Sequence, residues 1–126
     1  MSTKVKLYAV SLDCPDPAAL AAFYAEAMGW SVEYSSDEGA GIKGDGPTWI
    51  FFQKVEGFQA PRWPSQDAPQ QFHLDLAVPA DELSAACERA EAAGAVRADT
   101  QPNPERWTVF IDPVGHPFCL FKDSGG

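Results

Sequence analysis

The pattern of apolar and polar residues along the chain occurs twice in the same order. Each copy begins with alternating apolar residues, which are typical of a half-buried strand, and continues with apolar residues at helical spacing. The first copy is "KLYAVSLDCPDPAALAAFYAEAMGW", residues 6–30, and the second is "QFHLDLAVPADELSAACERAEAAGA", residues 71–95. This repetition predicts two similar units, each built from a strand and a helix.

Residues typical of helix ends mark where the two predicted helices begin and end. Asp16 suits the N-cap position, and Pro17 suits the first helical position, where its missing N–H costs nothing. Gly29 can adopt the left-handed conformation that ends a helix. In the second copy we expect Asp81 to cap the helix and Gly94 to end it.

Strand-like runs follow each predicted helix. The runs "WSVEYSS" and "TWIFFQKV" follow the first, with a glycine-rich turn around "EGAGIKGDGP" between them, and "AVRADT", "RWTVFID" and "PFCLF" follow the second. Both halves are therefore interpreted as βαβββ units. One such unit has an open sheet that cannot bury both faces, so we expect two tandem units to form a curved, partly closed mixed sheet with helices outside and a cavity inside. The predicted fold class is α+β.

A length of 126 residues is that of one domain. Within this single domain, residues 1–126, we expect the first unit at about 4–56, a connector at about 57–69 and the second unit at about 70–123. The connector is long for a structureless loop, and such loops are often functional. Its Trp63 is predicted to belong to a lid or a subunit interface, with a place at the edge of the core as the alternative.

Alternation within the strands assigns residues to the two faces of the sheet. Phe72, Leu74 and Leu76 are predicted to lie beneath a helix, and His73 and Asp75 to point the opposite way, into the cavity. We expect the cavity face to combine aromatic side chains with a few polar ones: Ala9, Ser11, Trp49, Phe51, Gln53, His73, Asp75, Phe110, Cys119 and Phe121. Such a lining suits a flat, partly apolar ligand that stacks on rings and is oriented by one or two hydrogen bonds.

The charge of the chain narrows the choice of partners. Eighteen acidic residues against nine basic ones leave a formal charge of −9, without a basic patch, which argues against binding to nucleic acid or to anionic membranes. No apolar run approaches the roughly 18 residues of a membrane-spanning helix, and the N-terminus does not resemble a signal peptide. Three widely spaced cysteines favour a reducing cytoplasm with free thiols over a disulfide framework.

Three polar residues of the predicted cavity face have two interpretations each. His73 is either a metal ligand or a histidine hydrogen-bonded to its neighbours. Asp75 is either a general base that works with His73 or simply a partner for it, and these two residues are the candidate catalytic pair. Cys119 is either a reactive thiol or metal ligand, or a small buried apolar residue.

Three segments carry a resemblance to a known family. "LDCPDPAALAAFYAEAMGW" in the first half, and "FHLDLAV" with "DPVGHPFCLF" in the second, resemble the vicinal oxygen chelate superfamily, in its glyoxalase-like and bleomycin-resistance-like group. The resemblance spans nearly the whole chain and implies the glyoxalase/bleomycin resistance/dioxygenase fold. It leaves the function open, because the superfamily contains isomerases, dioxygenases, epimerases and thiol transferases as well as proteins that only sequester antibiotics.

The resemblance also implies where a metal would sit. Enzymes of this superfamily hold one divalent ion with a residue from the first strand and a carboxylate from the last strand of each unit. The matching positions here are Ala9 and His73 on the first strands, and Gln53 and Cys119 on the last strands. Only His73 is a common ligand, so we expect no metal cofactor. The alternative is one divalent ion held by His73 and Gln53.

Two functions remain open. The first is a cytoplasmic module that binds and sequesters a small aromatic or hydrophobic metabolite or antibiotic, for example in self-resistance. The resemblance implies that it would do so as a homodimer. The scarcity of metal ligands at the matching positions favours this interpretation. The ligand would contact Trp49, Phe51, Gln53, His73, Phe110, Cys119, Phe121 and Trp63. The second is a lyase, isomerase or dioxygenase-like enzyme, which would use either a metal or His73 with Asp75 on a small oxygen-containing substrate.

Overall fold

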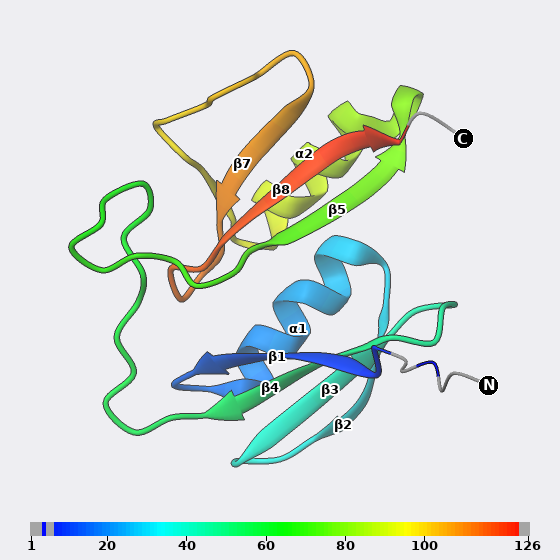
Figure 1. Cartoon of the computed structure of the whole chain (residues 1–126). Coiled ribbons are helices and arrows are strands. Elements are labelled where there is room, and N and C mark those ends of the chain that lie inside the picture. The colour runs from blue at the N-terminus through cyan, green and yellow to red at the C-terminus, as the bar shows by residue number, and fades with distance from the viewer. Residues whose placement is uncertain (1–3, 5–6, 124–126) are drawn as a thin grey trace. The chain divides into compact units, whose positions relative to one another are not determined.

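The structure of the protein is a computed structural model that describes residue 4 and residues 7–123. It divides into two compact units, the first ending at Phe58 and the second beginning at Gln59, so all but the first two residues of the predicted connector belong to the second unit. The described part of each unit contains one α-helix and four strands, most of which are labelled in Figure 1. The first unit consists of β1 (Ala9–Cys14), α1 (Pro17–Met28), β2 (Ser31–Ser35), β3 (Gly39–Lys43) and β4 (Trp49–Lys54).

The second unit repeats this order. It consists of β5 (Leu74–Pro79), a 3-10 turn η1 (Ala80–Glu82), α2 (Leu83–Ala93), β6 (Val96–Arg97), β7 (Trp107–Ile111) and β8 (Pro117–Asp123). The sheets have matching strand orders, β1-β4-β3-β2 and β5-β8-β7-β6. In each, the first and last strands of the unit pair in parallel and the other pairs are antiparallel. The predicted α+β fold of two tandem βαβββ units is therefore confirmed.

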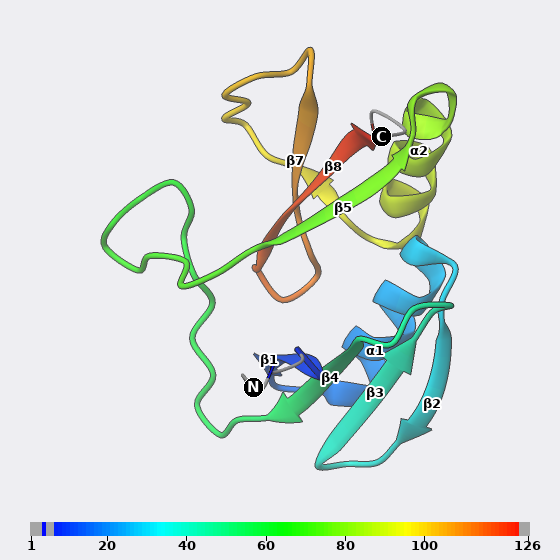
Figure 2. The ribbon, with the colours of Figure 1, turned by 45° about the vertical axis from the view of Figure 1, so that its right-hand side comes forward.

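Helix α1 covers one face of the first sheet (Figure 2). Asp16 caps it as predicted, because its Oδ1 accepts a hydrogen bond from the N–H of Ala19 at 3.2 Å. Gly29 ends it in the left-handed conformation, with φ at 71°. On its buried face, the ring of Tyr24 stacks on that of Phe52 from β4. The apolar face of the first sheet is therefore the one that α1 covers, and it carries Phe52.

Helix α2 begins differently from the prediction. Residues 80–82 form the turn η1, α2 starts at Leu83, and no side chain caps its first turn. The predicted capping role of Asp81 is therefore wrong, because the chain continues from β5 into a tighter turn before the helix. Gly94 does end α2, and its N–H donates to the carbonyls of Ala90 and Glu91.

The predicted glycine-rich turn contains a strand. Residues 39–43 form β3, which pairs with β2 on one side and β4 on the other. Gly41 lies opposite both Tyr34 and Phe51, and a Cβ there would come within 2.5 Å of the Tyr34 ring. Glycine is therefore present because two aromatic rings cover the backbone at this point, and not because the chain turns.

Phe72 also departs from its predicted place. Strand β5 begins at Leu74, so Phe72 precedes it, and its side chain is 87% exposed instead of lying beneath a helix. Among the described residues, no helix has the length and apolar character needed to span a membrane.

Candidate functional site

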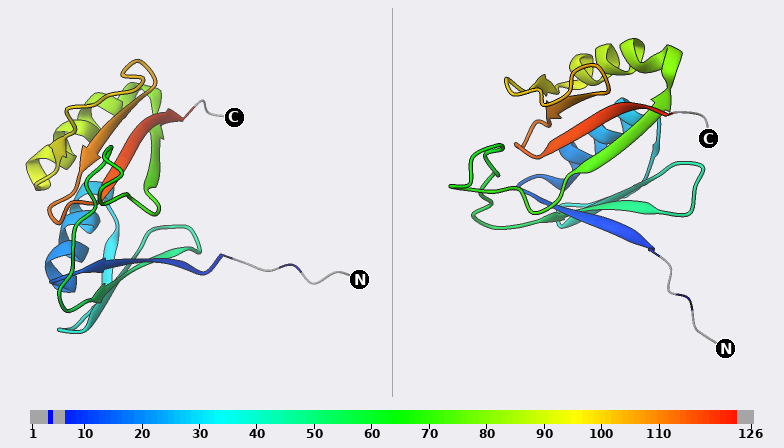
Figure 3. Two further views of the ribbon diagram at one scale, coloured as in Figure 1. Left: turned by 60° about the vertical axis from the view of Figure 1, so that its left-hand side comes forward. Right: turned by 45° about the horizontal axis from the view of Figure 1, so that its top comes forward.

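The second unit contains a cavity of about 680 Å³. Helix α2 covers one face of the second sheet (Figure 3). The cavity lies against the opposite face, which carries Asp75, Val109 and Cys119. Strands β5, β7 and β8 and the segments that precede β5 and β7 form its wall. The lining residues are Trp63, Gln70, His73, Asp75, Pro102, Arg106, Trp107, Val109, Pro117, Cys119, Phe121, Lys122 and Asp123.

Strand register explains why these side chains meet. Cys119 of β8 is opposite Asp75 of β5 on one side and Val109 of β7 on the other. Phe121 is opposite Trp107. Residues that are directly opposite each other on neighbouring strands point to the same face, so the three strands together present one continuous lining.

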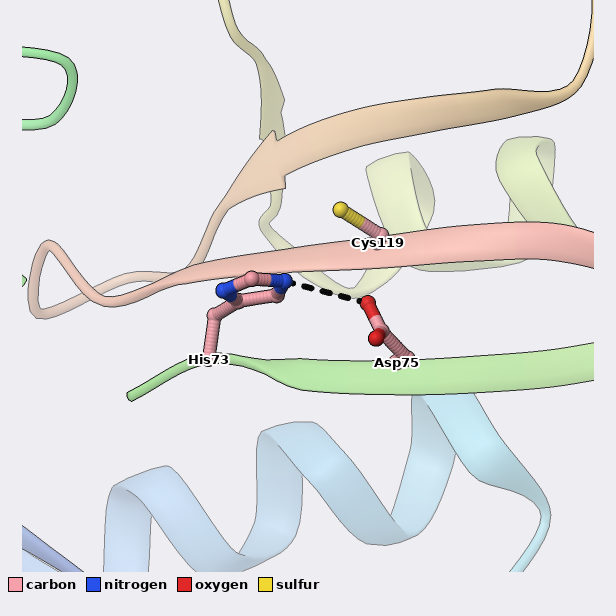
Figure 4. Close-up of side chains that lie close together, drawn as sticks. All are labelled: His73, Asp75 and Cys119. Atoms are coloured by element: carbon pink, nitrogen blue, oxygen red, sulfur yellow. Dashed lines mark ion pairs between the residues drawn. The ribbon is translucent and has the colours of Figure 1, made fainter. Parts of the chain in front are cut away.

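Three polar groups of this lining lie close together, as Figure 4 shows. His73 Nε2 lies 3.1 Å from Asp75 Oδ1. One ligand atom from each of His73, Asp75 and Cys119 lies within 4.8 Å of the other two. The side chains of His73 and Asp75 are 39% and 61% exposed, whereas Cys119 is 8% exposed. The predicted pairing of His73 with Asp75 is thus present, and the thiol lies beside it.

The thiol of Cys119 is held in its protonated form. Burial, followed by the negative charge of Asp75 and a side-chain hydrogen bond with Asp75, raises the pKa of Cys119 to about 11. A thiol with this pKa is thiolate in only about one molecule in ten thousand at pH 7, and the thiolate is the nucleophile. All three cysteines of the chain are buried thiols.

Gln70 lies in the segment that leads into β5, and it also lines the cavity. Its Oε1 is buried and has no hydrogen-bond partner among the described residues. Buried polar atoms are nearly always paired, so this carbonyl oxygen is an exception that needs an explanation. Gln70 could not be identified from the sequence, because a residue outside the strands has no alternation that would assign it to a face.

Two contacts hold the loop that carries Trp63, one within the loop and one to the turn that precedes β8. The N–H of Arg62 donates to the carbonyl of Ala68 at 2.6 Å. Ala60 packs against Gly115, where an added Cβ would lie 2.6 Å from the Ala60 Cβ. Trp63 lines the cavity. Its predicted roles, as a ligand contact and as part of a lid or a subunit interface, stay predictions.

Phe110 does not belong to this lining. It is opposite Phe118 on β8, the two rings stack at 5.6 Å, and both are fully buried on the helix-facing side. The predicted face of Phe110 is therefore wrong. Trp107 and Val109 take the places on β7 that face the cavity, and pairing β7 with β8 in register would have identified them.

Three predicted site residues lie in the first unit. Trp49 and Phe51 are half-buried on the face of β4 opposite Phe52, with their rings 5.5 Å apart. The ammonium group of Lys43 lies 5.2 Å from the Trp49 ring. Gln53 donates from Nε2 to Asp13 Oδ1 at 2.7 Å. The first sheet thus presents an aromatic surface on the face that α1 leaves open, as alternation predicted.

The donor set beside His73 differs from the one considered in the sequence analysis. Within the second unit, the groups next to His73 are Asp75 and Cys119, whereas Gln53 lies in the first unit. One imidazole, one carboxylate and one thiolate are ligand types of zinc, whose catalytic sites use three protein ligands and one open position. The sulfur disfavours magnesium and manganese. These three residues therefore fit a zinc-type ion by their chemistry, provided that Cys119 loses its proton on binding.

Solved structures with the same fold include proteins with different named roles. A complex of the fosfomycin resistance protein FosX from Listeria monocytogenes with Mn(II) and a dihydroxypropylphosphonic acid is 20% identical, with a TM-score of 0.73 over 94% of this chain and 90% of that one. A glyoxalase/bleomycin resistance protein/dioxygenase family enzyme from Burkholderia phytofirmans is also 20% identical, with a TM-score of 0.73 over 94% and 98% of the two chains. The oxidase ChaP-H2 is 19% identical, with a TM-score of 0.71 over 98% and 100%.

The family is identified by sequence. No curated protein matches the chain. The model of the glyoxalase-like domain family matches residues 9–121, which include all strands and helices except the last residues of β8. The matched region contains both βαβββ units and the His73, Asp75 and Cys119 cluster. The chain therefore belongs to the glyoxalase-like domain family, within the vicinal oxygen chelate superfamily.

Proposed function

We propose that the protein binds a small, largely apolar molecule with a flat aromatic part in the cavity of the second unit, and that it sequesters this molecule unchanged. The observation that carries the proposal is the lining itself. Trp63, Trp107 and Phe121 provide rings, and Val109 and Pro117 extend the apolar wall. A volume of about 680 Å³ lies within the range of cavities that hold small molecules.

The rings supply most of the expected affinity. An aromatic contact contributes about 0.5–1.5 kcal/mol beyond the burial of apolar area, and three rings line the cavity. The few polar groups among them are suited to orienting a ligand. Trp49, Phe51 and Gln53 of the first unit stay on the predicted list of ligand contacts.

The state of the polar cluster favours binding over covalent catalysis. A nucleophilic cysteine needs a lowered pKa, whereas burial and Asp75 raise the pKa of Cys119. His73 and Asp75 are paired with each other and substantially exposed, which suits orientation by hydrogen bonds at least as well as proton transfer.

A titration with indole, a flat bicyclic probe, tests the proposal. Ligand-detected NMR measures its dissociation constant for the wild-type chain, for Trp107→Leu and for the control Phe72→Leu. Phe72 belongs to the same unit, is 87% exposed and does not line the cavity. We expect saturable binding that Trp107→Leu weakens roughly threefold to tenfold and that Phe72→Leu leaves unchanged. Equal affinity in all three proteins would contradict the proposal.

The second candidate is a metal-dependent enzyme, which the donor atoms of His73, Asp75 and Cys119 within 4.8 Å favour. A bound zinc-type ion would supply Lewis-acid polarisation of a substrate oxygen. Elemental analysis of the purified protein distinguishes the two candidates. One equivalent of zinc per chain, lost in the Cys119→Ser and His73→Ala variants, would favour the enzyme, whereas indole binding by metal-free protein would favour sequestration.

A further inference from the structure

We infer that Arg106 selects ligands that carry a carboxylate on a short substituent of their flat aromatic part, so that the cavity takes an aromatic acid. The inference rests on the proposed function and specifies the chemical class of molecule that the cavity binds. It is carried by the place of one cation. Arg106 lines the cavity immediately before Trp107, and no carboxylate of the described residues pairs with it.

The turn that carries Arg106 is tied to β7. The carbonyl of Asn103 accepts hydrogen bonds from the N–H groups of Arg106 and Trp107, both at 3.1 Å. Gln101, which precedes this turn, bonds with both backbone groups of Val109 through its side chain. These contacts hold the backbone at Arg106 in place beside Trp107, so a ligand does not have to order it on binding.

The guanidinium of Arg106 is available to a ligand. In the part of the chain that the structure describes, it forms no ion pair, although acidic residues outnumber basic ones by 18 to 9. The other arginine near a strand of this sheet is different, because Arg97 pairs with Glu91 at 3.1 Å. The fold thus supplies a carboxylate to Arg97 and leaves the place beside Arg106 to a carboxylate from outside.

Aromatic rings lie next to this cation. Trp107 is opposite Phe121 on β8, and both line the cavity. Lys122, the other cation of the lining, follows Phe121 on β8, so the alternation of the strand directs its side chain to the opposite face. Arg106 lies in the turn before β7, where this alternation does not apply. A ligand that stacks on Trp107 therefore has Arg106 as its nearest cation.

The negative charges around the cavity limit the ligand to a single anionic group. Asp75 lies on β5, which β8 separates from β7, a spacing of roughly 10 Å at about 4.8 Å between neighbouring strands. Asp123 also lines the cavity, and the whole chain carries a formal charge of −9. These charges repel a dianion such as phosphate more strongly than a carboxylate. The planar guanidinium also matches the two oxygens of a carboxylate.

Two probes of nearly the same shape and different charge test the inference. Indole-3-acetate carries a carboxylate, and indole-3-acetamide carries a neutral amide in its place. Ligand-detected NMR at low ionic strength measures the dissociation constants of both, and of indole, for the wild type and for two variants. Arg106→Gln removes the cation of the cavity. Arg89→Gln is the control, because Arg89 is exposed on α2, outside the lining, and its loss changes the net charge equally.

We expect the wild type to bind indole-3-acetate roughly threefold to fivefold more tightly than indole-3-acetamide, the ratio expected for one favourable exposed ion pair. The net charge of −9 alone would give the opposite preference. The preference should disappear in Arg106→Gln and persist in Arg89→Gln, and thermal melting checks that both variants are folded.

A preference that survives in Arg106→Gln, or that Arg89→Gln removes equally, would overturn the role of Arg106. Equal or weaker binding of indole-3-acetate by the wild type would overturn it too, and this comparison needs no variant. Binding of indole without either derivative would overturn the inference and leave the binding function standing. Failure of all three probes to bind the wild type would overturn the proposed function, and this inference with it.

Discussion

The reactivity of Cys119 provides a quantitative test of the polar cluster. Its pKa of about 11 lies two units above the ordinary value of 9.0. Well below both values, the thiolate fraction is therefore about 100-fold smaller than that of an ordinary thiol, and alkylation by iodoacetamide is expected to be slower by a similar factor. The thiolate fraction, and with it the alkylation rate, increases about tenfold per pH unit. The rate should level off near pH 11, whereas the rate of an ordinary thiol levels off near pH 9.

The variant Asp75→Asn removes two of the three causes of this shift, the negative charge and the carboxylate acceptor. Burial, the largest cause, remains. The alkylation rate at pH 8 should therefore rise, but by less than 100-fold. Asp123→Asn is the matched control, because it removes another lining carboxylate that is not among the causes. Mass spectrometry of the peptide that contains residue 119 measures the rate for this cysteine alone.

Two results would refute this reasoning. One is a wild-type pH profile that levels off at or below pH 9, which would mean that neither burial nor Asp75 disfavours the thiolate. The other is a slower reaction in Asp75→Asn than in the wild type. Either would revive the interpretation of Cys119 as a nucleophile or a resident metal ligand.

Three further predictions concern stability and assembly. Gly115→Ala should lower the free energy of unfolding, measured by urea denaturation, by at least about 1–2 kcal/mol, because Gly115 has φ at 106° and faces Ala60. The control Gly46→Ala should be nearly neutral, because the space around Gly46 is open. Gln101→Leu should cost about 1–3 kcal/mol in the same assay. Gln101 accepts from the N–H of Val109 and donates to the carbonyls of Val109 and Ala98. Its loss removes the partner of the Val109 N–H, whereas the Val109 carbonyl keeps the hydrogen bond from the N–H of Ala98. The homodimer expected from the family resemblance predicts twice the chain mass in size-exclusion chromatography with light scattering, and the mass of one chain at all concentrations would contradict it.

The fold could be predicted from sequence because its signals are local. The strand–helix repeat, the Asp16 cap and the glycines that end both helices depend on residues close together in the chain. Strand β3 was missed because its glycines match a turn locally. Glycine is needed at position 41 because the rings of Tyr34 and Phe51, which belong to the neighbouring strands, cover the backbone there.

The site was predictable only in part, for a related reason. Alternation placed His73, Asp75, Cys119 and Phe121 on one face, and the structure brings them together. It placed Phe110 on the wrong face. Which residues of β7 point into the cavity depends on the residues of β8 that they pair with, and this register cannot be read from β7 alone. Gln70 lies outside any strand, so only tertiary structure reveals its buried carbonyl oxygen.

Binding in the second-unit cavity is tested most directly by the tryptophan side-chain signals of ¹⁵N-labelled protein during titration with indole. The chain has four tryptophans, of which Trp63 and Trp107 line the cavity, whereas Trp30 packs over Gly44 in the first unit. We predict that the Nε1–H signals of Trp63 and Trp107 shift together along one saturable curve while that of Trp30 stays in place. If Trp63 and Trp107 did not respond at indole concentrations that shift other signals, the cavity would not be the binding site.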